Sequence, residues 1–396
     1  MTSPKTPKKN RFERHPILTM MVVIIGVILL LLVVTETLLT LKHGPVTPYA
    51  HRAISLREFP PHYRKSKLPR DAQMALTDSL EKRVYTIRSD EKGFIMPSRI
   101  HDQPERTLLF LGGSTTECFY VDEEKRFPYL TGRLLEKRTG KKINALNAAF
   151  GGNHTLHSIN ILLNKGLPEK PDMAVMMHAI NDLYILILEG SYWNDHRSRS
   201  HLVPLNKQKD SWLKRLIREK IPHINAGTRI LQTRIKDTLD RWRGKENTPW
   251  KGAAADEWIN ARGRTYDIDN EGILSAFRRN LETFITTARI HGVTPVLMTQ
   301  ANRFKEDPDR LIAWLGATFF SSYGITYEQH MEIYRAFNDE IRAVARDHQV
   351  VLVDLDREIP HEREMMYDFV HLNDAGSEQA AAVIAATLEP HLSRKE

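Results

Sequence analysis

Hydrophobic positions fall into three regimes along this 396-residue chain. A continuous apolar run comes first, over residues 17–41, and a polar stretch punctuated by prolines follows to about residue 99. Beyond it, short apolar runs alternate with amphipathic stretches. Short apolar runs are typical of buried strands, and apolar positions three and four residues apart are typical of helices packed on them. The pattern predicts an apolar helix, a connecting segment and a folded α/β domain.

The folded part contains five predicted strands and five predicted helices. Strand and helix in alternation are typical of a parallel sheet with helices on both faces. In such sheets the functional groups gather at the carboxyl ends of the strands. The predicted strands are 107–111, 143–147, 173–178, 294–299 and 350–354, and the predicted helices are about 127–138, 155–165, 272–291, 327–348 and 374–392.

The apolar run over 17–41 is a predicted transmembrane helix whose single charge is Glu36. A bilayer requires about 20 apolar residues, whereas a cleaved signal peptide has an apolar region of about 7–15 residues followed by small residues. Here the run continues into Lys42 and His43. An uncleaved anchor is therefore the better interpretation.

Basic residues before this run predict its orientation, because positive charge beside a first span tends to stay in the cytoplasm. We expect a single-pass membrane protein with a cytoplasmic N-terminus and an extracytoplasmic remainder, periplasmic in a bacterium. Basic residues after the span, among them Lys42 and Arg52, oppose this bias. The preceding basic residues are Lys5, Lys8, Lys9, Arg11 and Arg14.

These observations divide the chain into four parts. Residues 1–16 are a predicted cytoplasmic N-terminus, 17–41 a transmembrane helix, 42–99 a stalk with some helix at about 71–82, and 100–396 the α/β domain. The stalk is inferred from its prolines. They are Pro45, Pro48, Pro60, Pro61 and Pro69.

A basic insertion at about 190–265 interrupts the alternation of strand and helix. Between residues 197 and 245, fourteen Lys or Arg oppose four Asp or Glu, a net of 14 − 4 = +10. One interpretation is a solvated helical cap on the core, and the other is a platform for a membrane surface or an acidic substrate. Its apolar positions suggest amphipathic helices: Trp212, Leu213, Leu216 and Ile217, then Ile230, Leu231, Ile235 and Leu239.

Composition narrows the function classes. The chain is 41% hydrophobic and 27% charged, which is typical of a globular protein. Its net charge of +8 permits anionic partners, but no nucleic-acid recognition signature is present, so we predict no nucleic-acid partner. The one cysteine, Cys118, excludes an intrachain disulfide and is expected to be a small core residue. His154 and His157 lack a third ligand at a fitting spacing, so no metal site is predicted.

Two glycine-rich motifs follow predicted strands. In LLFLGGSTTE a strand runs into Gly112 and Gly113 and then Ser114, so this serine is expected at a strand end with its amide pointing into a site. A helix N-cap would also explain Ser114. In NAAFGGNHT, Gly152 could supply a second backbone donor.

Two polar motifs complete the set. HAINDLY places Asn181 directly after an apolar run, where its side-chain amide could donate to an oxyanion or cap a helix. YDFVHLNDAGSEQAA places Asp368 three residues before His371. Such a histidine can take a serine proton as general base while the aspartate fixes its tautomer and stabilises its charge.

In this order the four motifs resemble those of the SGNH (GDSL-type) hydrolase family. Ser114 matches the serine of its first block, Gly152 the glycine of its second and Asn181 the asparagine of its third. The final Asp-x-x-His matches Asp368 and His371. The match extends over about residues 107–392 without the basic insertion.

The resemblance implies a flavodoxin-like three-layer α/β/α core, a catalytic triad of Ser114, Asp368 and His371, and an oxyanion hole from the Ser114 and Gly152 amides and the Asn181 side chain. It implies ester cleavage through an acyl-serine, with no metal or organic cofactor. Two positions depart from the family pattern, which has Asp at Gly113 and usually Gly at Ala179. Neither removes a reacting group, so an active enzyme is expected.

Three functions follow from these residues. The first is a membrane-anchored serine esterase acting on an extracytoplasmic ester, either an O-acetylated glycan or a lipid. The second is an O-acyltransferase that uses the same triad on an envelope glycan. The third is a non-catalytic assembly or glycan-binding protein that keeps the fold.

Overall fold

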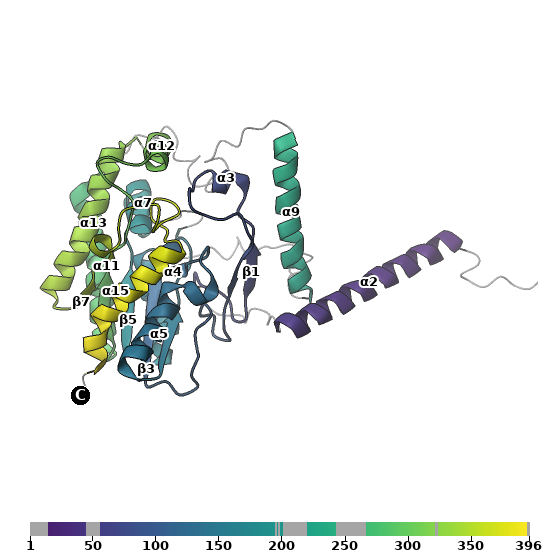
Figure 1. The fold of residues 1–396 in the computed structure, drawn as a ribbon, viewed down its shortest axis with the longest axis horizontal. Coiled ribbons are helices and arrows are strands. Elements are labelled where there is room, and N and C mark those ends of the chain that lie inside the picture. Colours follow the sequence, from purple (N-terminus) through teal and green to yellow (C-terminus); the bar gives the residue numbers. More distant parts are fainter. Residues whose placement is uncertain are drawn as a thin grey trace, which may run out of the picture.

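A computed structural model of the protein describes residues 15–44, 56–194, 196, 199–200, 220–242, 267–320 and 324–393. Its centre is a sheet in the order β4-β3-β5-β6-β7 in which every neighbouring pair is parallel (Figure 1). The predicted mixed α/β fold with a parallel sheet is confirmed, and each strand ends within a residue of its predicted end. The strands are β3 (Arg106–Gly112), β4 (Ile143–Asn147), β5 (Met173–Met177), β6 (Thr294–Met298) and β7 (Val351–Val353).

Helices cover both faces of this sheet because alternate strand residues point to opposite sides. Leu108 and Phe110 of β3 belong to a core with helices α5 and α15, whereas Leu109 and Leu111 belong to a core with α6, α7, α11 and α13. The helices are α4 (Ser114–Glu117), α5 (Phe127–Thr139), α6 (Thr155–Ile161), α7 (Ile180–Glu189), α11 (Asn270–Ile290), α12 (Arg310–Phe319), α13 (Tyr327–Asp347), α14 (Leu355–Glu358) and α15 (Asp374–Ser393).

The strand order creates a switch point beside β3. The chain moves from β3 outward to β4 and then returns to β5 on the other side of β3. Connections that diverge in this way leave a crevice at the carboxyl ends of the two strands. Ser114 follows β3 and Asn181 lies in the first turn of α7 after β5, so both lie at this crevice.

Residues 56–99, which the sequence suggested to be a stalk, pack on the domain. Strands β1 (Arg64–Lys67) and β2 (Tyr85–Arg88) form an antiparallel pair. Phe59, Ile87 and Ile95 form a buried apolar cluster, and Ile95 forms a bridge with Asn147 at the end of β4. The helix expected at about 71–82 is limited to α3 (Asp71–Met74).

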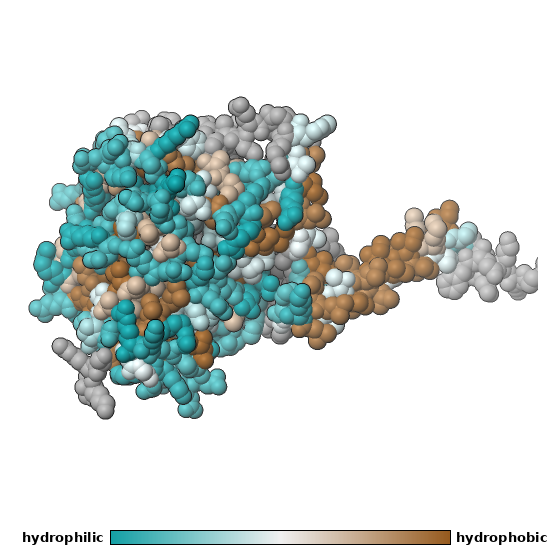
Figure 2. All heavy atoms as spheres, viewed as in Figure 1, coloured by the Kyte–Doolittle hydropathy of each residue, from teal (hydrophilic) through white to brown (hydrophobic). Residues whose placement is uncertain are grey.

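Helix α2 (Pro16–His43) projects from the domain as an exposed apolar rod (Figure 2). Among the described residues it is the one helix long and apolar enough to cross a membrane, and by length and composition a signal sequence near the N-terminus passes the same test. Helix α9 (Pro222–Trp242) contacts both α2 and β1. The remaining predicted helix of the insertion, at Trp212, Leu213, Leu216 and Ile217, lies outside the described residues.

Candidate active site

Ser114 lies at the start of α4, directly behind the end of β3. Both preceding glycines are required by close approach. A Cβ on Gly112 would lie 2.1 Å from Oγ1 of Thr116, and a Cβ on Gly113 would lie 2.3 Å from Nδ2 of Asn181. The absence of a side chain at residue 113 therefore lets the Asn181 amide approach the serine turn.

The structure brings Ser114, His371 and Asp368 into a hydrogen-bonded row. Nε2 of His371 lies 2.7 Å from Oγ of Ser114, and Nδ1 lies 2.8 Å from Oδ2 of Asp368. The backbone N–H groups of Val370 and His371 donate to Oδ1 of Asp368 at 2.9 and 2.8 Å. With Nδ1–H donating to the carboxylate, Nε2 is left to accept the serine proton.

Electrostatics favour a charged histidine in this row. Burial lowers the pKa of His371, but the Asp368 charge and its hydrogen bond outweigh burial and raise the pKa above its ordinary value. For Asp368, burial raises the pKa, and His371 with the two backbone donors lowers it overall. The imidazolium formed by proton transfer from serine is therefore stabilised where it forms.

Two observations bear on the predicted oxyanion donors. No backbone carbonyl oxygen within the described residues accepts the backbone N–H of Ser114 or of Gly152. Nδ2 of Asn181 donates to the carbonyl oxygen of Asn153 at 2.8 Å, which leaves its second N–H for another acceptor. Ala179, which directly precedes α7, is buried.

Arg57 holds the loop that carries Gly152, and sequence reasoning missed it. Its guanidinium donates to Oδ1 of Asn153 at 3.1 Å and to the carbonyl oxygen of Gly151 at 3.0 Å. The Asn153 side chain in turn donates to the Arg57 carbonyl oxygen at 3.1 Å. The apolar alternation of Tyr85 and Ile87, typical of a half-buried strand, was the sequence signal that this region folds onto the domain.

Arg199, within the basic insertion, was also missed. Its Nη1 donates to Oδ1 of Asn181 at 2.7 Å, which fixes the direction of the Asn181 amide. Two histidines of the Gly152 loop and α6 hold the backbone of Arg199 and Ser200. Nε2 of His154 lies 3.1 Å from the carbonyl oxygen of Arg199, and Nε2 of His157 lies 3.2 Å from that of Ser200. Arg199 thus reaches the site, and His154 and His157 hold its backbone and that of Ser200 through hydrogen bonds.

Glu117 and Cys118 lie directly behind the serine. Glu117 is buried and accepts the backbone N–H of Gly151, and burial raises the pKa of its carboxyl group. Cys118 is buried and its thiol donates to the carbonyl oxygen of Thr115 at 3.2 Å. Burial raises the pKa of this thiol to about 12, so it is protonated and inert at neutral pH, as expected for a core residue.

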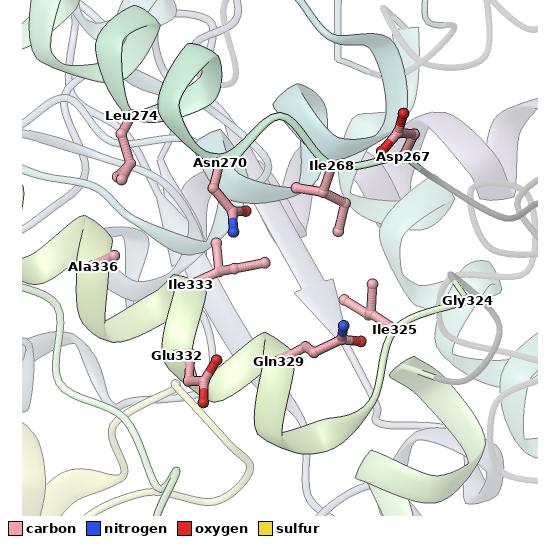
Figure 3. A pocket seen from close by; sticks show the side chains of 10 residues that line it. All are labelled: Asp267, Ile268, Asn270, Leu274, Gly324, Ile325, Gln329, Glu332, Ile333 and Ala336. Carbon is pink, nitrogen blue, oxygen red and sulfur yellow. The ribbon is translucent and has the colours of Figure 1, made fainter.

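A separate hollow of about 530 Å³ lies between the N-terminal parts of α11 and α13 (Figure 3). Its lining combines aliphatic side chains such as Ile268 and Ile333 with the polar Asn270, Gln329 and Glu332. No member of the Ser114 group lines it. Among the described residues no group of three His, Cys, Asp or Glu side chains could hold a metal ion.

Comparison with known proteins gives distant structural likenesses only. No family model matches the sequence, and no curated protein matches it. An α/β hydrolase from the metagenome of Lake Arreo is 15% identical, with a TM-score of 0.40 over 74% of this chain and 98% of that one. An acetylxylan esterase from Geobacillus stearothermophilus is 14% identical, with a TM-score of 0.40 over 72% of this chain and 94% of that one. A lipase/acylhydrolase from Enterococcus faecalis is 16% identical, with a TM-score of 0.40 over 74% of this chain and 99% of that one. These likenesses are too distant to carry an activity over to this chain.

Proposed function

We propose that this chain is a serine ester hydrolase. The observation that carries the proposal is the row of Ser114, His371 and Asp368, joined at 2.7 and 2.8 Å. A surface histidine that merely satisfies its own hydrogen bonds has no need of a serine on one nitrogen and a carboxylate on the other. A nucleophile, a base in reach of it and a third group that orients the base are together the signature of nucleophilic catalysis.

The reaction follows from these contacts. Oγ of Ser114 attacks the ester carbonyl carbon while Nε2 of His371 takes its proton, and the carbonyl oxygen becomes an oxyanion beside the Ser114 and Gly152 amides and the Asn181 side chain. The C–O bond then breaks, and His371 returns the proton to the departing alcohol. Water then attacks the acyl-serine while His371 takes its proton. The bond between the acyl carbon and Oγ breaks, His371 returns that proton to Oγ, and the acid and free Ser114 are released.

The membrane placement is part of the same proposal. Helix α2 anchors the chain, its N-terminus faces the cytoplasm, and the catalytic domain lies on the other side of the membrane. The basic residues at positions 5–14 support this orientation. The substrate would then be an ester outside the cytoplasm, an O-acetylated glycan or a lipid.

The first test labels the nucleophile and does not depend on the substrate. Full-length protein in detergent is treated with a fluorophosphonate probe, which reacts with activated serines. We expect labelling of wild type, none of Ser114→Ala, and strong loss in His371→Ala. Ser275→Ala, which removes an exposed hydroxyl of α11, is the matched control and should label like wild type. Equal labelling of Ser114→Ala and wild type would contradict the assignment.

Turnover of p-nitrophenyl esters of short and long acyl chains then tests hydrolysis. Loss of a triad member is expected to lower kcat by about 10⁴- to 10⁶-fold. A preference for acetyl esters would favour acetylated glycans, and a preference for long chains would favour lipids. Labelling without turnover, with release of the acyl group only on addition of a sugar, would show that the acyl-serine is passed to a hydroxyl acceptor and that the chain is an acyltransferase.

A further inference from the structure

Glu36, the one charged residue in the apolar run, is buried against the domain. Pro16 begins α2 and Glu36 lies 20 residues further on, a rise of about 30 Å, which matches the hydrocarbon thickness of a bilayer. Glu36 is 7% exposed, whereas the apolar residues before it are mostly half or more exposed. It therefore marks the point where the apolar helix reaches the domain.

Glu36 is bound by the first turn of α9. Its two carboxylate oxygens accept the backbone N–H groups of His223 and Ile224 at 2.9 and 3.0 Å. These are donors that an α-helix leaves without an internal partner, and the helix dipole favours a negative charge beside them. Nε2 of His223 also lies 3.2 Å from the carbonyl oxygen of Gly44. The start of α9 is thus fastened to the domain end of α2.

Helix α9 turns its apolar side away from the protein. Leu231, Ile235, Leu239 and Trp242 are 57, 50, 41 and 83% exposed, and their spacing of four, four and three residues places them on one face. On the opposite side of the helix Asp237 is buried, and its Oδ2 lies 3.3 Å from Nζ of Lys82. A contiguous exposed apolar stripe of this kind is typical of a surface that contacts a partner or a membrane.

The exposed face lies on the side of the domain from which α2 leaves. In Figure 1, α9 runs up the side of the domain and α2 extends outward from its lower end. Figure 2 shows hydrophobic residues along that same outer side of α9. Arg234 and Lys236, one position to either side of Ile235, are exposed. Apolar residues flanked by basic ones are the composition of helices that lie in the headgroup region of a membrane.

We propose that α9 lies in the interface of the bilayer that α2 crosses. Its apolar stripe, Leu231, Ile235, Leu239 and Trp242, enters the boundary between headgroups and acyl chains, and Arg234 and Lys236 extend toward lipid phosphates. Glu36 joins the crossing helix to the in-plane helix at the level of the membrane surface. Helices α2 and α9 together thereby hold the domain against the membrane. Strand β1 lies on the membrane side of the domain, because it contacts α9.

The test measures the depth of single nitroxide labels in full-length protein. Cys118→Ser removes the native thiol, labels are attached through Ile235→Cys, Lys236→Cys or Val27→Cys, and the protein is reconstituted in vesicles of phosphatidylcholine and phosphatidylglycerol. Oxygen concentrates in lipid and a nickel chelate in water. Collision with either reagent speeds the spin relaxation of a nitroxide. We expect oxygen to have the larger effect on the labels at 27 and 235, and the nickel chelate to have the larger effect on the label at 236.

Three outcomes would overturn the proposal. Equal access of nickel to the labels at 235 and 236 would show that the stripe faces water. Protection of the 235 label from both reagents, with dipolar broadening, would show that a second copy covers it. A water-exposed label at 27 would show that α2 is not in the bilayer.

Glu36→Ala should lower the oxygen exposure of the label at 235 and leave that of the label at 27 unchanged. An unaltered signal at 235 would refute the role given to Glu36. Each readout is independent of ester hydrolysis.

Discussion

Replacement of Arg57 tests whether the loop carrying Gly152 must be held in place for catalysis. Arg57→Ala removes the two bonds from the guanidinium to Asn153 and Gly151. The bond from the Asn153 side chain to the carbonyl oxygen of residue 57 is kept, as are the bonds from the Gly151 N–H to Glu117 and from the Asn181 side chain to the Asn153 carbonyl oxygen. The Gly152 amide, one of the proposed oxyanion donors, then loses part of its support.

The magnitude follows from these bonds. A hydrogen bond to a charged group contributes about 1.5–3 kcal/mol, and about 1.4 kcal/mol corresponds to a tenfold change in rate. Loss of one whole oxyanion donor costs about 10²- to 10³-fold in kcat, which sets a ceiling. We therefore expect Arg57→Ala to lower kcat about tenfold to a hundredfold with little change in KM. Arg57→Lys keeps the charge but loses the planar guanidinium, so its kcat should lie between that of wild type and that of Arg57→Ala.

The assay is steady-state hydrolysis of a p-nitrophenyl ester by full-length wild type, the two Arg57 variants and Arg83→Ala. Arg83 belongs to the same segment and pairs with Asp122 on the surface, where an ion pair contributes little, so its removal should leave kcat unchanged. Thermal melting checks that every variant is folded. A folded Arg57→Ala with wild-type kcat would refute the reasoning, and an increase in KM alone would show that Arg57 contacts substrate instead of supporting the loop.

Four further predictions concern the site. Because the pKa of His371 is raised and the neutral ring is the base, kcat/KM should rise with pH, and the midpoint of this rise should lie above the ordinary pKa of histidine. Asp368→Asn should move that limb to lower pH and lower kcat about 10⁴-fold, and an unmoved limb would contradict the assignment. The same raised pKa stabilises the fold at low pH, and this contribution is lost as pH rises through the folded value, which melting of His371→Ala against wild type measures. Asn181→Ala should lower kcat about a hundredfold with KM nearly constant, and less than a threefold loss would remove Asn181 from the oxyanion hole. Gly113→Ala should lower kcat because its Cβ would meet the Asn181 amide, whereas Gly227→Ala in α9, with open space around it, should be neutral; equal rates for the two would show that Asn181 is free to move.

The sheet and its covering helices were predictable because burial on both faces leaves a visible apolar pattern. The runs that became β3 to β7 are continuous and short, and helices such as α13 show the expected period. Ser114, His371 and Asp368 could also be identified from the sequence, since each lies in a short motif at a strand end or in a turn. Helix α7 was not predicted, because Ile180–Glu189 is apolar on nearly all sides and so lacks a helical period.

Arg57 and Arg199 were not predictable for a different reason. Arg57 bonds to Gly151 and Asn153, 94 and 96 positions away, and Arg199 bonds to Asn181, 18 positions away. No local pattern marks an arginine as the one that will fold back onto a loop more than ninety positions away in sequence. Their segments resembled a linker and a charged insertion, and only tertiary packing distinguishes an arginine in contact with the site from its solvated neighbours.

The place of Arg57 in the chain links the state of the juxtamembrane segment to the enzyme. It lies thirteen positions after Gly44, the residue that caps the C-terminal end of α2, by 57 − 44 = 13. A protease that cuts before Leu56 would sever the covalent link to α2 and leave Arg57 on the domain, with its bonds to the Gly152 loop intact. A cut just beyond Arg57 would leave nearly the same domain without this arginine. Cleavage in the juxtamembrane segment would therefore yield an active or an impaired enzyme according to a shift of a few residues in the cleavage position.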